Sequence, residues 1–132
     1  MQILQIKSSR KVEFIEITDK VSAIVSESGV KEGLCHLFVP HTTAGIIINE
    51  NSDPSVREDI KEMLSRMVPD SAKYNHSEGN SPAHIKSSIV GCQVTLPVRD
   101  FHLELGTWQG IFLCEFDGPR TRQVWLSLLK IR

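Results

Sequence analysis

The chain of 132 residues is the size of one domain, and its 40% hydrophobic and 23% charged residues are typical of a folded globular protein. Fifteen basic and sixteen acidic side chains give a net charge of -1, which argues against the electrostatic attraction that non-specific nucleic-acid binding requires. The longest apolar runs fall far short of the roughly 20 residues that span a bilayer. We therefore expect one domain over residues 1–132 that binds neither nucleic acid nor a membrane.

The N-terminal segment and the cysteines both indicate the cytoplasm. The first positive charges follow a short alternating stretch, whereas a signal peptide begins with its positive charges. Cys35, Cys92 and Cys114 share no CxxC spacing and lie in apolar runs, which favours buried free thiols.

The first elements are short strands followed by a helix. Residues 3–6 and 12–17 alternate between apolar and polar side chains, which predicts two strands, and we expect them to form a β-hairpin. Thr18 or Asp19 can cap a short helix that ends near Gly29.

Two further strands and a second helix follow. Residues 33–39 and 44–49 are β-rich, and the four residues between them are too few for a crossover helix, which predicts an antiparallel pair. Asp53 followed by Pro54 is a typical helix start, and apolar side chains at helical spacing continue to Met67.

A polar loop over residues 69–80 leads to a third helix. Ser81 is the expected N-cap, and Gly91 is expected to end this helix. The remaining strand-like runs give about seven strands and three helices in total, at residues 93–98, 110–116 and 121–131. We therefore expect an α+β single domain, a mainly antiparallel sheet with about three helices packed on one side.

Three histidines lie in polar segments next to strand ends or helix starts. His41 is in a link between strands, and His76 and His84 flank the start of the third helix. Three imidazoles with an open coordination position suit zinc or another divalent metal. The alternative is that they only hydrogen-bond to the backbone of their loops.

Several hydroxyl and cationic side chains are suited to binding phosphate, although the pattern by itself favours a solvated surface with capping hydroxyls. They are Thr42, Thr43, Ser87, Ser88, Lys86, Arg120 and Arg122.

Glu115 and Trp108 each have two interpretations. Glu115 lies in an apolar strand, so it either faces solvent or is buried beside a cation such as Arg120 or a metal. Trp108 can stack on a planar ligand, or it belongs to the core or to a subunit contact.

Four segments together resemble the YjbQ family along nearly the whole chain. They are PHTTAGIIINENSDPSV (40–56), HSEGNSPAH (76–84), LGTWQGI (105–111) and EFDGPRTR (115–122). The resemblance implies a compact α+β subunit, a homotrimer, and a cluster of histidines and acidic residues that holds a metal such as zinc, or an anion. It also implies a thiamine-phosphate synthase activity, which couples hydroxymethylpyrimidine diphosphate with thiazole phosphate and releases pyrophosphate.

The resemblance also assigns expected roles to individual residues. His41, His76 and His84 are the expected metal ligands, with zinc, or magnesium with substrate, as the cofactor. Glu50 and Glu115 are expected to orient the ligands or act as bases, and Arg120 to clamp the anion. The expected substrate-binding residues are Thr42, Thr43, Asn49, Glu78, Asn80, Lys86 and Trp108.

Two other functions remain open from the sequence. The same histidines can activate water in a metal-dependent hydrolase of a small phosphorylated metabolite. A non-catalytic trimer that binds a metal or metabolite is the third possibility.

Overall fold

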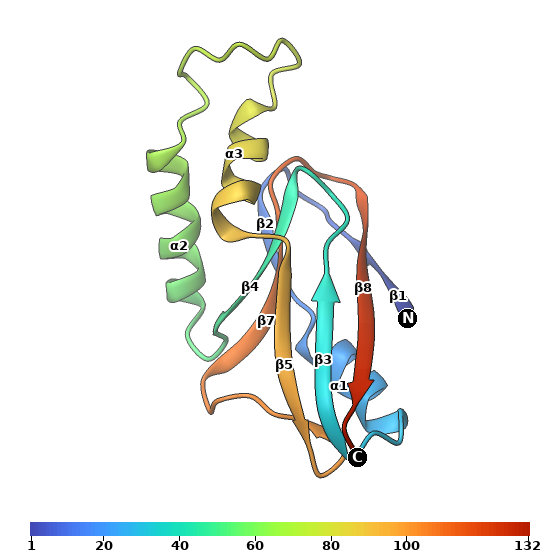
Figure 1. The fold of residues 1–132 in the computed structure, drawn as a ribbon. Helices are drawn as coiled ribbons and strands as arrows, with labels where there is room; N and C mark the ends of the chain where they lie inside the picture. The colour runs from blue at the N-terminus through green and yellow to red at the C-terminus, as the bar shows by residue number, and fades with distance from the viewer.

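The computed structural model describes residues 1–132 and confirms the α+β class, with three helices and antiparallel sheets. The strands form two sheets, one in the order β1-β8-β3-β5-β6 and one in the order β2-β7-β4 (Figure 1). None of the helices has the length and apolar character that a membrane-spanning helix requires. The elements are β1 (Gln2–Lys7), β2 (Glu13–Glu16), α1 (Thr18–Glu27), β3 (Glu32–Phe38), β4 (Ala44–Glu50), α2 (Pro54–Met67), α3 (Ser81–Val90), β5 (Gln93–Arg99), β6 (His102–Leu103), β7 (Gln109–Glu115) and β8 (Thr121–Lys130).

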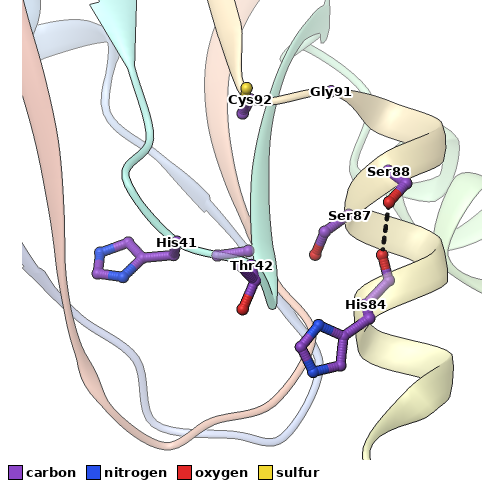
Figure 2. A pocket seen from close by; sticks show the side chains of 8 residues that line it. His41, Thr42, His84, Ser87, Ser88, Gly91 and Cys92 are labelled. Carbon is purple, nitrogen blue, oxygen red and sulfur yellow. Dashed lines mark hydrogen bonds between the residues drawn. The ribbon is translucent and has the colours of Figure 1, made fainter.

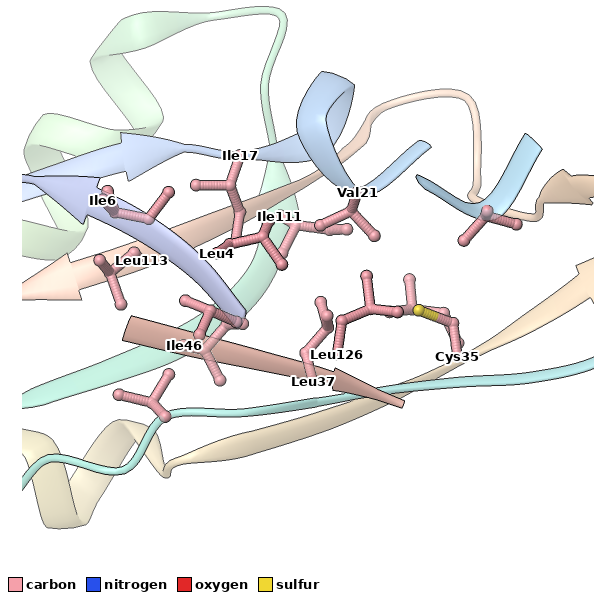
Figure 3. Packing of buried hydrophobic residues seen from close by; sticks show 14 of the residues in the cluster. Leu4, Ile6, Ile17, Val21, Cys35, Leu37, Ile46, Ile111, Leu113 and Leu126 are labelled. Atoms are coloured by element: carbon pink, nitrogen blue, oxygen red, sulfur yellow. The ribbon is translucent and has the colours of Figure 1, made fainter. Parts of the chain in front are cut away.

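The main core lies between the two sheets, because alternate residues of a strand point to opposite faces. Ile46 and Ile111 of the three-stranded sheet belong to the same buried cluster as Leu37 and Leu126 of the five-stranded sheet, and α1 adds Val21 (Figure 3). The thiol of Cys35 is also buried there, and burial raises its pKa to about 11. This cysteine is therefore a core residue, as its apolar surroundings in the sequence predict.

A second buried cluster lies on the other face of the three-stranded sheet. Phe112 and Cys114 of β7 pack there with Leu64 of α2 and Ala83 of α3. The three-stranded sheet is therefore buried on both faces. The helices α2 and α3 share one side of it, while α1 packs with the residues between the sheets.

Two predicted strand pairings are wrong, although the strands themselves are present. β1 pairs with β8 and β2 pairs with β7, so residues 3–17 form no hairpin. β3 pairs with β5 and β8, whereas β4 pairs with β7, so the link over residues 39–43 passes from one sheet to the other. A short link permits a hairpin but does not require it, and here the strands of each expected pair face one core from opposite sheets.

The helix ends mostly agree with the sequence. Asp53 caps α2 by accepting a hydrogen bond from the Ser55 amide at 2.9 Å, and Pro54 is the first helical residue. Gly91 ends α3 at a positive φ of 91°, which a glycine adopts without strain. The N-cap of α3 is Asn80 instead of Ser81, and its side chain bonds elsewhere.

Candidate functional site

A polar cleft of about 370 Å³ opens between the β3–β4 link and α3 (Figure 2). Its shape depends on Gly45 of β4, where an added Cβ would lie 2.6 Å from the carbonyl oxygen of Gly91. This close approach holds the start of β4 against the end of α3. The cleft is lined by His41, Thr42, Ala44, His84, Ser87, Ser88, Gly91 and Cys92.

His84 also borders a second, shallower cleft of about 360 Å³ that contains His76. The two imidazole rings are perpendicular, with centroids 5.5 Å apart. Nε2 of His76 lies 3.9 Å from the carboxylate of Glu78. His76 and His84 therefore lie together across the loop, as a shared ligand or metal would require. The second cleft is lined by Tyr74, Asn75, His76, Ser81, His84 and Ile85.

His41 does not join the other two histidines in the single chain. Its ring turns away from His84 (Figure 2), and its Nε2 accepts a hydrogen bond of 2.9 Å from the backbone amide of Gln123. That bond requires an unprotonated Nε2 and so places the proton of the neutral ring on Nδ1. Burial and the nearby Arg122 lower the pKa of His41, against the opposite effect of Glu115. His41 is thus held as a neutral ring that anchors the β3–β4 link to β8.

A buried ion pair lies behind this link. Glu115 of β7 is fully buried and accepts hydrogen bonds from Nε of Arg122 at 2.9 and 3.0 Å and from the Ser8 hydroxyl at 2.7 Å. Arg122 also donates to the hydroxyl of Thr43 at 2.8 Å and to its carbonyl at 3.1 Å. The ion pair therefore connects β7 and β8 to Thr43, the residue that follows Thr42 in the β3–β4 link.

The charge state of Glu115 follows from these contacts. Burial alone would raise its pKa, but the hydrogen bonds from Arg122 and Ser8 outweigh that effect and hold the pKa below its usual value. Glu115 is therefore a buried carboxylate beside a cation, which is one of its two interpretations from the sequence, but the cation is Arg122 and not Arg120. Arg120 is instead exposed and bonds to the side chain of Asp117 at 2.7 Å.

Three other predicted site residues lie at the far end of β4. In the register of the sheet Ala44 faces Glu115, whereas Glu50 faces Gln109, six residues further along. Six residues of strand span about 20 Å. Asn49 accepts a hydrogen bond from the amide of Glu50, and Trp108 is 62% exposed. Glu50, Asn49 and Trp108 therefore line neither histidine cleft.

The hydroxyl and lysine candidates are divided between two sides of α3. Ser87 and Ser88 face the first cleft, but their hydroxyls donate to the carbonyls of Ala83 and His84 within the helix. Their oxygens remain free only as acceptors. Lys86 is buried on another side of α3, and its Nζ lies 5.9 Å from the ring centroid of Phe116.

Sequence reasoning missed the pairing role of Arg122 and the presence of Tyr74 and Cys92 beside the histidines. A signal for Arg122 existed, because it alternates in β8 with the buried residues Val124 and Leu126 and so faces the core with them. The sequence contains no comparable signal for Tyr74 or Cys92. Their places beside the histidines depend on how the loop before α3 and the end of α3 pack in the folded chain.

The donor types at the paired histidines suit zinc, which binds imidazole nitrogen and carboxylate oxygen. No group of three or more histidine, cysteine, aspartate or glutamate side chains is placed to hold a metal ion in the single chain. The pair His76 and His84 therefore offers two nitrogen ligands, with the Glu78 carboxylate beside His76.

The chain matches the family model described as UPF0047 protein YjbQ-like over residues 2–131. A UPF0047 protein of Methanocaldococcus jannaschii is 51% identical over 95% of this chain and 91% of its own length. UPF0047 protein YugU of Bacillus subtilis is 45% identical over 98% of each chain. A crystal structure of an uncharacterized conserved protein of the yjbq/upf0047 family from Clostridium acetobutylicum has 46% identity and a TM-score of 0.95, and the match covers 98% of this chain and 100% of that one.

Proposed function

Since this chain belongs to the YjbQ-like UPF0047 family, we propose that it is an enzyme acting on small phosphorylated substrates, with a thiamine-phosphate synthase activity. The observation that carries the proposal is the pair of imidazoles of His76 and His84, of which His84 lines two open clefts. A divalent metal held by these imidazoles would suit a reaction that needs charge neutralisation and positioning of its substrates.

The proposed coupling has that requirement. The thiazole nitrogen of the phosphate-bearing half attacks the methylene carbon of hydroxymethylpyrimidine diphosphate with its lone pair. The bond from that carbon to oxygen breaks, and its electron pair leaves with pyrophosphate. No proton is removed from either substrate in this step, so no protein base is needed. Hydrolysis of a phosphoester, in contrast, usually uses a base to activate water, a role that His76, His84 or the nearby Glu78 would have to take, and the phosphoester panel below tests this alternative.

A divalent metal, zinc or magnesium, is part of the proposal, with His76 and His84 as its protein ligands. Such a metal, if bound there, would neutralise negative charge on the leaving pyrophosphate. The side chain of Thr42 lines the first cleft and can donate a hydrogen bond to a substrate phosphate. The Glu115–Arg122 pair acts indirectly in this proposal, by fixing Thr43 and with it the link that carries His41 and Thr42.

The direct test is to supply the purified protein with both substrate halves, with zinc or magnesium, and to measure thiamine phosphate and pyrophosphate. We expect both products in equal amounts, and no product when either half is omitted. A panel of phosphoesters is assayed in parallel. Hydrolysis of a phosphoester without coupling would replace the synthase proposal with a hydrolase, and no turnover of any kind would contradict an enzymatic role.

We also propose that the protein is a homotrimer that contacts its copies through the outer face of the five-stranded sheet. Neither α2 nor α3 covers that face (Figure 1). Leu34 and Leu129, which are neighbours in the register of β3 and β8, are exposed on it, and Phe38 packs against Trp125 beside them. Exposed apolar surface of this kind commonly marks a protein contact.

Light scattering after size-exclusion chromatography tests this assembly. We expect a mass about three times the 14.8 kDa of one chain. Leu129→Glu places a charge on the proposed contact and should shift the protein towards monomer. Met67→Glu, on the exposed part of α2, is the matched control and should leave the mass unchanged. A monomeric wild-type protein would contradict the proposal.

We place this activity in the cytoplasm. The three cysteines are all free, and two of them are buried, which suits a reducing compartment.

A further inference from the structure

The α3 side of the first cleft offers hydrogen-bond acceptors. Ser87 and Ser88 line it, and their hydroxyl protons are already donated to carbonyls of the helix at 2.8 and 2.9 Å. Each hydroxyl oxygen therefore presents only its lone pairs to a ligand. The side chains of Ser87, Thr42 and His84 converge on the space between the β3–β4 link and α3 (Figure 2). No lysine, arginine, aspartate or glutamate lines this cleft.

The C-terminal end of α3 adds a negative electrostatic potential to the same wall. Ser87 and Ser88 belong to the last turn of this helix of 10 residues, and Gly91 is its C-cap. The last carbonyls of a helix have no partners within it and form the negative end of the helix dipole. The last turn of α3 contains no basic side chain, so the helix does not neutralise this end itself.

The cations nearest to the cleft are already neutralised. Arg122 and Arg120 both act on the neutral ring of His41 at the edge of the cleft and lower its pKa. Arg122, however, forms its ion pair with Glu115, and Arg120 forms one with Asp117. The α3 side of the cleft is therefore suited to a group that carries positive charge.

The proposed coupling produces such a group. The lone pair of the thiazole nitrogen becomes the new bond to the methylene carbon, so the nitrogen acquires a positive charge. The electron pair of the broken carbon–oxygen bond leaves with pyrophosphate. A fixed negative potential at the nitrogen stabilises the transition state more than the neutral thiazole, and this difference accelerates the reaction.

We propose that the first cleft binds the thiazole half with its ring against the last turn of α3. Ser87, Ser88 and the helix end then stabilise the positive charge on the ring nitrogen, while Thr42 on the opposite wall donates to the phosphate of the same molecule. The cleft volume of about 370 Å³ lies within the range of about 300–1,000 Å³ that is typical of small-ligand sites. This assignment rests on the proposed synthase function and names the half-substrate that each wall of the cleft recognises.

Calorimetric titration of the whole protein at pH 8, where a free imidazole is neutral, tests the assignment without turnover. The two probes are hydroxyethylmethylthiazole phosphate and its N-methylthiazolium derivative, which differ by one methyl group and one positive charge. We expect the thiazolium to bind at least about threefold more tightly. Equal affinities, a preference for the neutral thiazole, or no binding of either probe at millimolar concentration would overturn the assignment.

Two substitutions of Ser88 separate the effect of charge from that of size. Ser88→Lys and Ser88→Met add side chains of similar length, and a lysine in the last turn is favourable for a helix, so Ser88→Lys should fold. We expect Ser88→Lys to weaken thiazolium binding about tenfold more than Ser88→Met does, because only lysine repels the cation. Ser65→Lys is the matched control, since Ser65 is exposed near the end of α2 and does not line the cleft. An equal loss in Ser88→Lys and Ser88→Met, or an equal loss in Ser88→Lys and Ser65→Lys, would overturn the assignment.

The coupling assay separates failure of this assignment from failure of the proposed function. Formation of thiamine phosphate by a protein that shows no preference for the thiazolium would leave the synthase proposal standing and overturn the assignment. A thiazolium preference that Ser88→Lys removes, in a protein that forms no thiamine phosphate, would support a site for a heteroaromatic cation in this cleft and contradict the synthase.

Discussion

Replacing Arg122 with methionine is expected to lower the free energy of unfolding by about 3–5 kcal/mol, measured by urea denaturation at neutral pH. The substitution leaves the fully buried carboxylate of Glu115 without its main partner. It also removes the hydrogen bonds that Arg122 donates to Thr43, so the β3–β4 link should loosen. The protein should therefore lose stability and the fixed shape of the first cleft together.

The matched control is Arg99→Met, because Arg99 forms an ion pair with Glu104 on the surface, where its side chain is 70% exposed. Exposed pairs contribute about 0–1 kcal/mol, so this variant should unfold at nearly the wild-type urea concentration. The double variant Arg122→Met/Glu115→Gln should recover part of the loss, since it no longer buries a lone charge. Equal stabilities of Arg122→Met and Arg99→Met would contradict the role given to the buried pair.

His84→Ala is expected to abolish metal binding and to lower kcat of the proposed coupling by at least about tenfold. Loss of a group that merely supports a metal ligand already costs about 10–100-fold, and the variant removes a proposed ligand itself. The first measurement is the zinc content of protein purified without a histidine tag or added metal. About one equivalent per chain in the wild type and none in the variant is the expected result.

His102→Ala is the control, because His102 lies in β6 and lines neither histidine cleft. It should retain both metal and activity. His76→Ala should behave as His84→Ala does, since the two rings lie together. Absence of zinc from every variant and from the wild type would remove zinc from the proposal, and activity reduced by less than tenfold in both variants would remove the catalytic role of the pair.

Part of the candidate site could be predicted from the sequence. The polar segments around His76 and His84 lie at a loop and a helix start, and those local features indicate that the two side chains can meet across a short distance. The grouping of His41 with them could not be judged from spacing, because the orientation of its ring depends on the amide of Gln123 in a distant strand. Glu50 belongs to the same sequence segment as His41, yet an extended strand carries it to the other end of the sheet.

The elements that could be predicted from the sequence are those whose causes are local. The Asp53–Pro54 start of α2 and the Gly91 end of α3 depend on capping and on backbone freedom, and these act within a few residues. The alternation of β1, β3 and β8 likewise follows from which side chains must be buried. The YjbQ resemblance also came from the residues alone, and the family match over residues 2–131 confirms it.

Strand pairing and the choice of charge partners, in contrast, depend on the folded chain as a whole. The short links would allow β1 to pair with β2, and β3 with β4. Because two sheets pack around one core, however, β1 and β3 lie in one sheet and β2 and β4 in the other. The choice of Arg122 over Arg120 as the partner of Glu115 arises in the same way. Pairing and burial are set by contacts between residues far apart in the chain, and the free energy of those contacts is not encoded in any local pattern.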